Sequence, residues 1–262
     1  HLPIDRVSIE CCDAPLVSPA VCNAIREADI ILFAPGSLYT SIMPILQVPA
    51  IVQAIRENRK ALKILGANFL VQAGETDISR RRWNRGLYVS ELVEAYGHNV
   101  EGGAEGLFDV VLSANLEHIS GDVLRNYALE GKSPIYLDRS RVESLGVLPL
   151  EATVYSPERL KRAGVIHHDP QKFALAVRTL LVAHQRLGLN RKHASSRTIP
   201  ARSSNNTVTG ASPLCCYYRE ADAVLAEKRF HPRSLREIMR EIIWENRDIR
   251  ITHLKFFRAA QI

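Results

Sequence analysis

The sequence predicts an α/β fold: a Rossmann-like, mainly parallel sheet with flanking helices, plus a small helical C-terminal appendage. From Val7 onwards, short β-branched runs alternate with segments of helical periodicity, which is the pattern of stacked βα units. Residues 30–34 form a continuous apolar run that ends at Pro35-Gly36. Such a run is typical of a strand buried on both faces of a parallel sheet. We therefore expect a central strand here, followed by a sharp turn.

The first predicted helix covers residues 19–27. Ser18 supplies an N-cap, Pro19 occupies the first helical position, and apolar residues recur behind them at helical spacing. The same reasoning extends along the chain. Strands are expected over residues 62–65, 108–113 and 135–137, and helices over residues 88–96 and 121–129.

A long helix is expected to close this domain near Gly188. Asp169-Pro170 begins the helix, and its apolar residues follow the 3.6-residue period. Residues 1–188 are therefore expected to form the α/β domain, and residues 189–215, rich in Ser, Asn, Arg and Thr, a flexible basic linker. Within residues 216–262, Ser234-Leu-Arg-Glu237 is a capping box ahead of an apolar stripe, which predicts an amphipathic helical appendage.

The basic charge of the chain is concentrated in its last quarter. Residues 189–262 hold 14 Lys or Arg against seven Asp or Glu, whereas residues 1–188 hold 20 against 21. A basic tail can attract nucleic acid or another anionic partner, but it is more often a solvated face. Because no RNA-binding pattern accompanies the tail, we expect no nucleic-acid partner. The apolar stripe of the appendage is a candidate contact for homo-oligomerisation.

Composition excludes several classes of protein. With 46% apolar and 24% charged residues, the chain is not disordered as a whole. Its apolar runs fall far short of the roughly 20 residues that span a bilayer, and no signal-peptide pattern opens the chain. We therefore expect a cytoplasmic protein without a membrane partner. The five cysteines lack the spacing of a zinc site, so we expect reduced thiols.

The turn after the first predicted strand carries the clearest candidate site. Pro35-Gly36 is followed by Ser37, Thr40 and Ser41 at the predicted start of a helix. Ligands of open parallel sheets bind beyond the carboxyl ends of strands, where a helix N-terminus presents free N–H groups to an anion. Gly36 permits close backbone approach, and the hydroxyls can hydrogen-bond phosphate oxygens. Phosphate binding and simple helix capping by Ser37 or Thr40 both remain open from the residues alone.

Four stretches resemble segments of one known family, in the same order. They are Ala28-Asp-Ile-Ile31 with Pro35-Gly-Ser-Leu-Tyr-Thr-Ser-Ile42 and Pro44; Gln72-Ala-Gly-Glu-Thr-Asp77; Phe108-Asp-Val-Val-Leu-Ser-Ala-Asn115; and Ile166-His-His-Asp-Pro-Gln-Lys172. Together they span roughly residues 4–187 and are similar to the CofD-like family. The Gly-Ser-Leu-Tyr-Thr-Ser loop resembles its YvcK-type gluconeogenesis-factor branch, whereas the transferase branch usually has Ser-Asn-Pro there.

The resemblance implies a Rossmann-like core that binds a nucleotide-diphosphate ligand. The YvcK-type branch implies a regulator of central carbon metabolism and cell-envelope shape that binds a UDP-sugar such as UDP-N-acetylglucosamine. The alternative is a 2-phospho-L-lactate transferase, which moves a phospholactyl group from a guanosine diphosphate-linked donor to the deazaflavin Fo with Mg²⁺. Whether the chain is an enzyme stays open. The family pattern begins with a Gly-Gly-Gly-x-Gly turn and a first half that have no counterpart here, so we assign no metal ligand.

The resemblance also implies roles for the residues of the first motif. Gly36, Ser37, Thr40 and Ser41 are expected to contact phosphates. Tyr39, just after the turn, can stack on a base or pack inward, and inward packing is the more common arrangement.

Two further places complete the predicted site. Glu75, Thr76 and Asp77 follow Gly74 in a loop at the carboxyl edge of the sheet, where they can hold Mg²⁺ or a sugar hydroxyl, or form a helix N-cap. Asn115 ends a strand, where it can bind a nucleobase or sugar or simply form a turn.

Two charged clusters have weaker claims to function. Arg80-Arg81-Arg82, with Trp83 and Arg85, can clamp a diphosphate or contact RNA, but such runs are more often exposed loops. The His167-His168-Asp169 segment invites a metal or catalytic role. Adjacent side chains diverge, however, and Asp169 is already explained as a helix N-cap.

Overall fold

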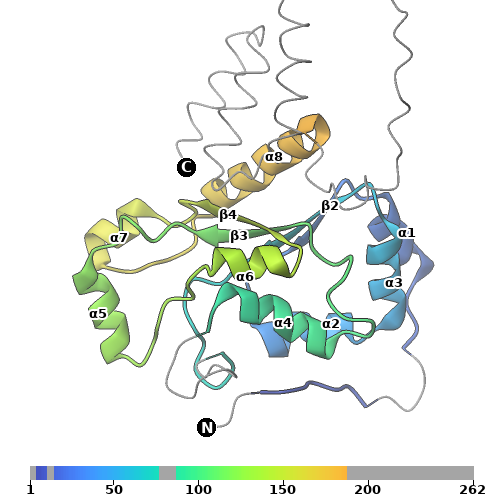
Figure 1. The fold of residues 1–262 in the computed structure, drawn as a ribbon, viewed down its shortest axis with the longest axis horizontal. Helices are drawn as coiled ribbons and strands as arrows, with labels where there is room; N and C mark the ends of the chain where they lie inside the picture. The colour runs from blue at the N-terminus through green and yellow to red at the C-terminus, as the bar shows by residue number, and fades with distance from the viewer. Residues whose placement is uncertain (1–3, 11–14, 77–86, 188–262) are drawn as a thin grey trace, which may run out of the picture.

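A computed structural model describes residues 4–10, 15–76 and 87–187, and every structural statement below concerns these residues. Its centre is a four-stranded, fully parallel sheet in the order β1-β2-β3-β4 (Figure 1). The strands are β1 (Ile30–Phe33), β2 (Leu62–Gly66), β3 (Val110–Ala114) and β4 (Leu148–Ala152). The predicted α/β class, with a mainly parallel sheet flanked by helices, is confirmed.

Helices connect the parallel strands, as crossover connections require. Helix α1 (Pro19–Glu27) precedes β1, and η1 (Leu38–Ile42), α2 (Met43–Leu46) and α3 (Pro49–Glu57) join β1 to β2. Helix α4 (Val89–Asn99) precedes β3, and α5 (Gly121–Leu129) and α6 (Arg139–Ser144) precede β4. Helices α7 (Pro157–Ala163) and α8 (Pro170–Leu187) follow β4.

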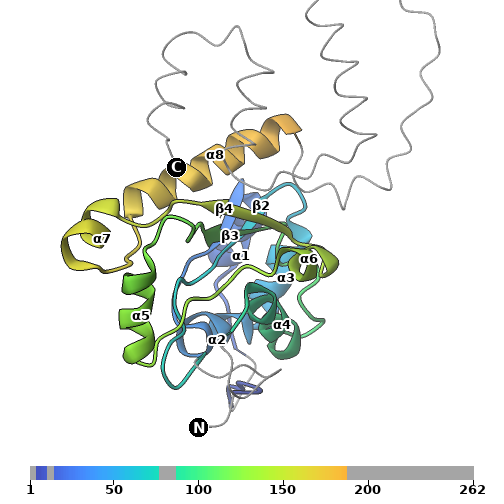
Figure 2. The same ribbon diagram turned by 60° about the vertical axis from the view of Figure 1, so that its left-hand side comes forward.

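Two apolar clusters cover the two faces of the sheet. Figure 2 shows α8 on one side of the strands and α2 and α4 on the other. Strands β2 and β3 are buried along their whole length, and their side chains pack into both clusters. In β2, for example, Ile64 belongs to the cluster with Leu180 of α8, whereas Leu65 belongs to the cluster with Met43 and Val93. This three-layer arrangement leaves the carboxyl ends of the strands free to form a site.

Local capping signals explain where the first and last helices begin. Helix α1 covers the predicted residues, although Ser18 caps it with its backbone carbonyl and its side chain makes no capping hydrogen bond. At α8, Asp169 Oδ1 accepts hydrogen bonds from the backbone N–H groups of Gln171 and Lys172, at 3.0 and 3.1 Å. The predicted N-cap role of Asp169 is therefore confirmed.

The first strand does not occupy the predicted central position. Among the described residues, β1 pairs with β2 alone and forms an edge of the sheet. Leu32 is 40% exposed, so the strand is not buried on both faces as the apolar run of residues 30–34 led us to expect. A continuous apolar run indicates a strand. It does not report how many strands lie beside it.

Residues 135–137 do not form a strand of the sheet, contrary to the prediction. The segment bonds to the loop after β2 and to the start of α4: Ile135 N–H donates to Phe69 O, and Tyr136 O accepts from Val89 N–H. The sequence analysis did not predict β4, which contains Pro149. Proline is tolerated at a sheet edge, and the carbonyl of Pro149 accepts a hydrogen bond from Arg139 at 2.7 Å.

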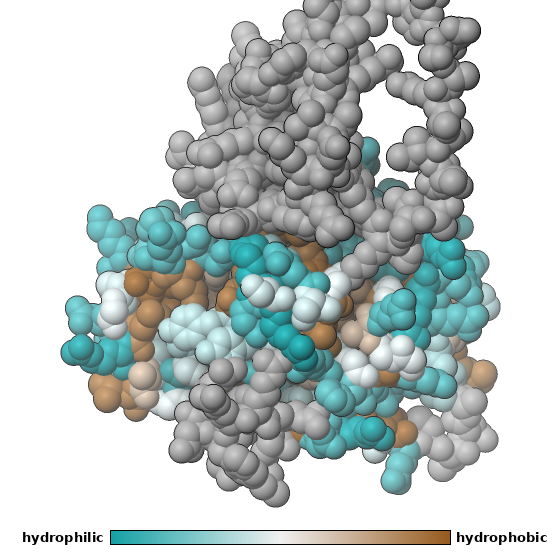
Figure 3. Space-filling model, in the orientation of Figure 1, coloured by the Kyte–Doolittle hydropathy of each residue, from teal (hydrophilic) through white to brown (hydrophobic). Residues whose placement is uncertain are grey.

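Helices α5 and α7 lie at one end of the sheet and carry an apolar surface. Neither helix contains a buried residue, and Leu129 of α5 and Val165, which follows α7, are exposed. Figure 3 shows apolar residues gathered at this end of the molecule.

Some predictions lie outside the described part of the chain, including the basic linker, the helical appendage and the Arg80–Arg82 run. Within the described part, Cys22 is a buried free thiol. No single described helix is long and apolar enough to cross a membrane. The segments Leu38–Leu46 and Pro49–Glu57 reach that length only as a pair, which is bent by 77°.

Candidate functional site

The predicted loop after β1 is held by residues that follow β2. Asn68 Nδ2 donates a hydrogen bond to the carbonyl of Gly36 at 2.9 Å, and Gln72 Nε2 donates to Ser37 Oγ at 3.2 Å. Both contacts join segments more than 30 residues apart in sequence at neighbouring strand ends. The structure thus brings the first two family motifs together at the carboxyl edge of the sheet.

Gly66, the last residue of β2, allows this close approach. A Cβ atom at this position would lie 2.9 Å from the ring of Pro35 and 2.9 Å from the ring of Phe173. Any larger residue would push the β1 turn and α8 away from β2. The sequence signal for this contact is a glycine at the end of a buried strand, which marks close packing.

The hydroxyls of the loop do not cap the following helix. Ser37 makes no side-chain capping bond, and its Oγ accepts from Gln72 instead. Thr40 Oγ1 donates to Glu75 Oε1 at 2.6 Å, while Thr40 and Ser41 are exposed. Of the two alternatives for Ser37 and Thr40, simple capping is therefore not what the structure shows.

The described part of the second motif, residues 72–76, forms a tight turn beside the loop. Thr76 is buried, and its Oγ1 accepts a hydrogen bond from the backbone N–H of Gln72 at 2.8 Å, so it stabilises the turn. Gly74 has a φ of +77°, which glycine adopts without strain. Asp77 lies outside the described residues.

Two side-chain oxygens in this turn are buried without a protein partner. Gln72 Oε1 and Glu75 Oε2 have no hydrogen-bond donor within the described part of the chain. Burying an acceptor without a donor costs on the order of 1–3 kcal/mol, so such atoms are rare and call for an explanation. A ligand that carries hydroxyl or N–H donors, or a hard cation, would satisfy both oxygens.

Tyr39 does not face this site. Its ring is 7% exposed within one of the two apolar clusters, and its hydroxyl donates to the carbonyl of Ile4 at 3.3 Å. Inward packing, the more common arrangement of the two considered, is what the structure shows. Tyr39 therefore anchors the loop to the apolar cluster and cannot stack on a nucleobase in this conformation.

Asn115 uses its side chain to form a turn. Its Oδ1 accepts from Glu117 N–H at 2.9 Å, and its own N–H donates to the carbonyl of Ala152 at 2.9 Å. The amide oxygen is thus engaged in an Asx turn, which agrees with the backbone alternative for this residue.

His168, which sequence reasoning set aside, lies close to the strand ends. Its ring stacks on Phe69 with centroids 3.7 Å apart and packs edge-on against Phe173 at 6.1 Å. Burial, together with the neighbouring His167, lowers the pKa of His168 to about 4. The motif of residues 166–172 marked this segment, but the stack of His168 on Phe69, which is distant in sequence, is visible only in the folded chain.

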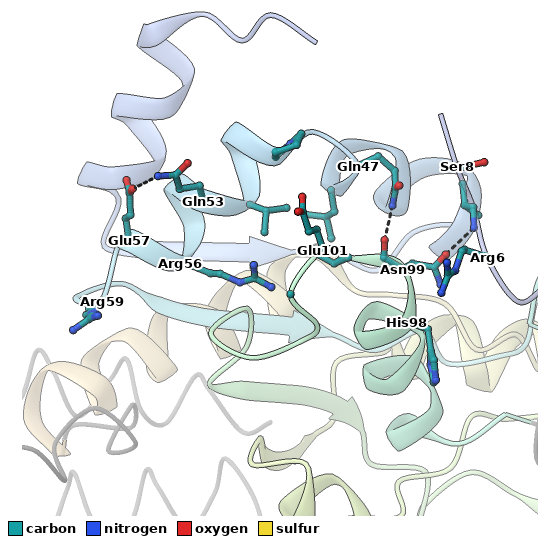
Figure 4. A pocket seen from close by; sticks show the side chains of 16 residues that line it. Arg6, Ser8, Gln47, Gln53, Arg56, Glu57, Arg59, His98, Asn99 and Glu101 are labelled. Carbon is teal, nitrogen blue, oxygen red and sulfur yellow. Dashed lines mark hydrogen bonds between the residues drawn. The ribbon is translucent and has the colours of Figure 1, made fainter. Parts of the chain in front are cut away.

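A separate cavity of about 930 Å³ lies at the opposite, amino-terminal edge of the sheet (Figure 4). The segment Arg6 to Ser8, the α2–α3 region and the end of α4 line it. Arg56 points toward the glycine-rich loop before β3, where it donates to the carbonyls of Gly103 and Glu105 at 2.6 and 3.1 Å. Arg56 therefore stabilises that loop, and the cavity contains none of the predicted site residues.

The fold and site together define a Rossmann-like α/β protein with a polar loop cluster at the carboxyl edge of its sheet. The chain matches the family model described as 2-phospho-L-lactate transferase CofD over residues 1–155. It therefore belongs to the CofD family, as the four motifs indicated.

The most informative relatives are gluconeogenesis factors. The chain is 34% identical over 155 residues to the gluconeogenesis factor of Halalkalibacterium halodurans, covering 59% of this chain and 43% of that protein. It is 31% identical over 163 residues to the gluconeogenesis factor of Bacillus subtilis, covering 62% of this chain and 46% of that protein. The resemblance to the YvcK-type branch is thereby confirmed.

A solved structure shows the same fold. A crystal structure of a UPF0052-family protein from Bacillus halodurans matches with a TM-score of 0.50 and 31% identity, covering 61% of this chain and 46% of that one. The chain thus spans less than half the length of these relatives.

Proposed function

We propose that this chain is part of a nucleotide-sugar-binding regulator of the gluconeogenesis-factor type, with the ligand's diphosphate held at the loop of residues 36–41. The relatives named gluconeogenesis factor support the regulator class. The observation that carries the proposal is the pair of hydrogen bonds that tie the loop of Gly36 and Ser37 to Asn68 and Gln72.

The residues of the loop cluster supply both kinds of contact that a nucleotide-sugar needs. Phosphate oxygens accept hydrogen bonds. The exposed hydroxyl of Ser41 can donate one, and so can that of Ser37, which accepts from Gln72 and keeps its own proton. Sugar hydroxyls donate hydrogen bonds, and Gln72 Oε1 and Glu75 Oε2 are acceptors without a partner in the described residues. A ligand with an anionic and a hydroxyl-rich part therefore complements the cluster.

The second candidate is a 2-phospho-L-lactate transferase, because the matching family model carries that description. Glu75 Oε2 and the neighbouring Gln72 Oε1 are hard oxygen ligands of the type that Mg²⁺ prefers, so these two residues fit a magnesium ion. When bound, Mg²⁺ would neutralise phosphate charge. Among the described residues, no group of three His, Cys, Asp or Glu side chains is arranged to hold a metal.

One experiment separates the two candidates. The protein is incubated with the guanosine diphosphate-linked phospholactyl donor, Fo and Mg²⁺, and transfer to Fo is followed. In parallel, equilibrium binding of UDP-N-acetylglucosamine is measured. We expect saturable UDP-sugar binding and no transfer; Mg²⁺-dependent transfer to Fo would contradict the regulator and support the transferase.

A further inference from the structure

We propose that His168 contacts the bound nucleotide-diphosphate ligand, donating a hydrogen bond from Nε2 to an uncharged oxygen of its base or sugar. This inference rests on the proposed function and adds to it the residue that recognises the part of the ligand beyond the phosphates.

The position of His168 is fixed by the chain on both sides. A β-bridge pairs His168 with Tyr155, and the backbone N–H of Asp169 donates to the carbonyl of Val154 at 3.0 Å. Its ring lies nearly parallel to the ring of Phe69, with an interplanar angle of 28°, and meets Phe173 edge-on. The imidazole is therefore held in one orientation before any ligand binds, which lowers the entropic cost of binding.

The two aromatic partners of His168 connect it to the candidate site. Phe69 directly follows Asn68, which holds the carbonyl of Gly36. The ring of Phe173 lies against Gly66 at the end of β2, where the ring of Pro35 also approaches. His168 thus stands at the same strand ends as the loop of residues 36–41, on the side covered by α8.

Of the two ring nitrogens of His168, Nε2 is the one that can donate a hydrogen bond to a ligand. Nδ1 of His168 is buried and has no hydrogen-bond partner within the described residues, whereas Nε2 is not among the buried, unpartnered atoms. A proton on Nδ1 would bury an unsatisfied donor, so the favoured neutral tautomer carries its proton on Nε2. Because burial keeps the ring uncharged near pH 7, the group offers one hydrogen-bond donor and no charge.

A neutral donor suits a carbonyl or hydroxyl oxygen better than a phosphate. Phosphate oxygens bind most strongly to charged or clustered donors, which the loop of residues 36–41 is better placed to supply. Phe69 is buried behind the His168 ring, so the imidazole is the part of this stack that a base or a sugar can reach.

His167 provides a matched control for the experiment. It is the adjacent histidine and is exposed, and its Nδ1 contacts the carbonyl of His168 at 2.9 Å. Replacing it removes an imidazole from the same segment without removing the stack on Phe69.

The test combines calorimetry with nitrogen NMR on the whole protein, with UDP-N-acetylglucosamine as the probe and GDP with Mg²⁺ as the second. His168→Phe keeps an aromatic ring against Phe69 but removes Nε2. We expect it to weaken binding about three- to tenfold, whereas His167→Phe leaves binding within twofold. Histidine NMR of the wild type should show the Nε2–H tautomer of His168, with an Nε2 shift on ligand addition.

The outcomes separate this inference from the proposed function. Wild-type binding that His168→Phe retains in full, or a ligand-insensitive His168 Nε2 signal in a protein that binds, would overturn the inference alone. Absence of wild-type binding to either probe would overturn the proposed function and this inference with it. If His168→Phe does not fold, the wild-type NMR signal still decides.

Discussion

At the scale of single residues, the described site depends on side chains that satisfy one another across neighbouring strand ends. Thr40 and Glu75 meet in one hydrogen bond, and Thr76 closes the turn that presents Glu75. His168 is different, because, like one oxygen each of Gln72 and Glu75, its Nδ1 is buried without a partner in the described part of the chain. A residue kept neutral by burial leaves a signature in the pH dependence of stability.

The first prediction concerns that pH dependence. The pKa of folded His168 is about 4, below the ordinary value of 6.5. The unfolded state therefore binds more protons as the pH falls below 6.5, and the stability contributed by the neutral ring is lost between pH 6.5 and 4. Relative to His168→Phe, the wild type should lose about 1 kcal/mol of unfolding free energy between pH 7.5 and 5.0, because solvent screening reduces the effect for a partly exposed ring.

Urea unfolding at the two pH values measures this difference, with His167→Phe as the control. The control should retain most of the wild-type pH dependence, because burial, the larger cause of the lowered His168 pKa, is unchanged and only the smaller effect of His167 is removed. Equal pH dependence in the wild type and His168→Phe would show that His168 titrates normally in the folded protein.

At the scale of elements, the caps of α1 and α8 differ in a way that mutation can measure. The Asp169 carboxylate accepts two backbone N–H groups at the start of α8, whereas the Ser18 side chain makes no capping bond at α1. Asp169→Ala should therefore cost about 1 kcal/mol of unfolding free energy, and Ser18→Ala less than about 0.5 kcal/mol. Chemical denaturation of the two variants tests the difference, and equal losses would contradict the assignment.

Local signals account for what could be predicted at this scale. The proline and cap at residues 18–19 gave the bounds of α1, and the Asp169-Pro170 pair gave the start of α8. The edge position of β1 and the bridging role of residues 135–137 depend on which distant strand lies alongside, and no local pattern carries that information.

The candidate site likewise has features that the local sequence predicts and features that depend on distant contacts. The loop of residues 36–41 and the motif beginning at Gln72 were visible as motifs, and the structure joins them. The inward direction of Tyr39 depends on its contact with Ile4, and the position of His168 depends on Phe69. These contacts span 35 and about 100 residues of sequence, so only the folded chain reveals them.

At the scale of the whole molecule, the sheet separates two apolar clusters that should behave independently. Ile64 faces the cluster with α8, and Ile55 of α3 belongs to the cluster on the other face. Shortening a buried isoleucine to valine typically costs 0.5–1.5 kcal/mol, roughly 1 kcal/mol here for each of Ile64→Val and Ile55→Val. The double variant should lose the sum within about 0.5 kcal/mol, because the sites share no partners.

Denaturant unfolding of the two single variants and the double variant checks this additivity. A coupling well above that limit would show that the two faces form one packing unit. A substitution on one face of the sheet would then alter the stability of the packing on the other face.

The central claim is that the loop after β1, held by Asn68 and Gln72, binds the diphosphate of a nucleotide ligand. Calorimetric titration of wild type and of the Ser37→Ala/Thr40→Ala variant with UDP-N-acetylglucosamine tests it most directly, with Ser8→Ala at the opposite edge of the sheet as the control. We expect binding to the wild type and the control, and a loss of about tenfold or more in the double variant. Equal affinity in all three proteins would contradict the assignment of this loop as the ligand site.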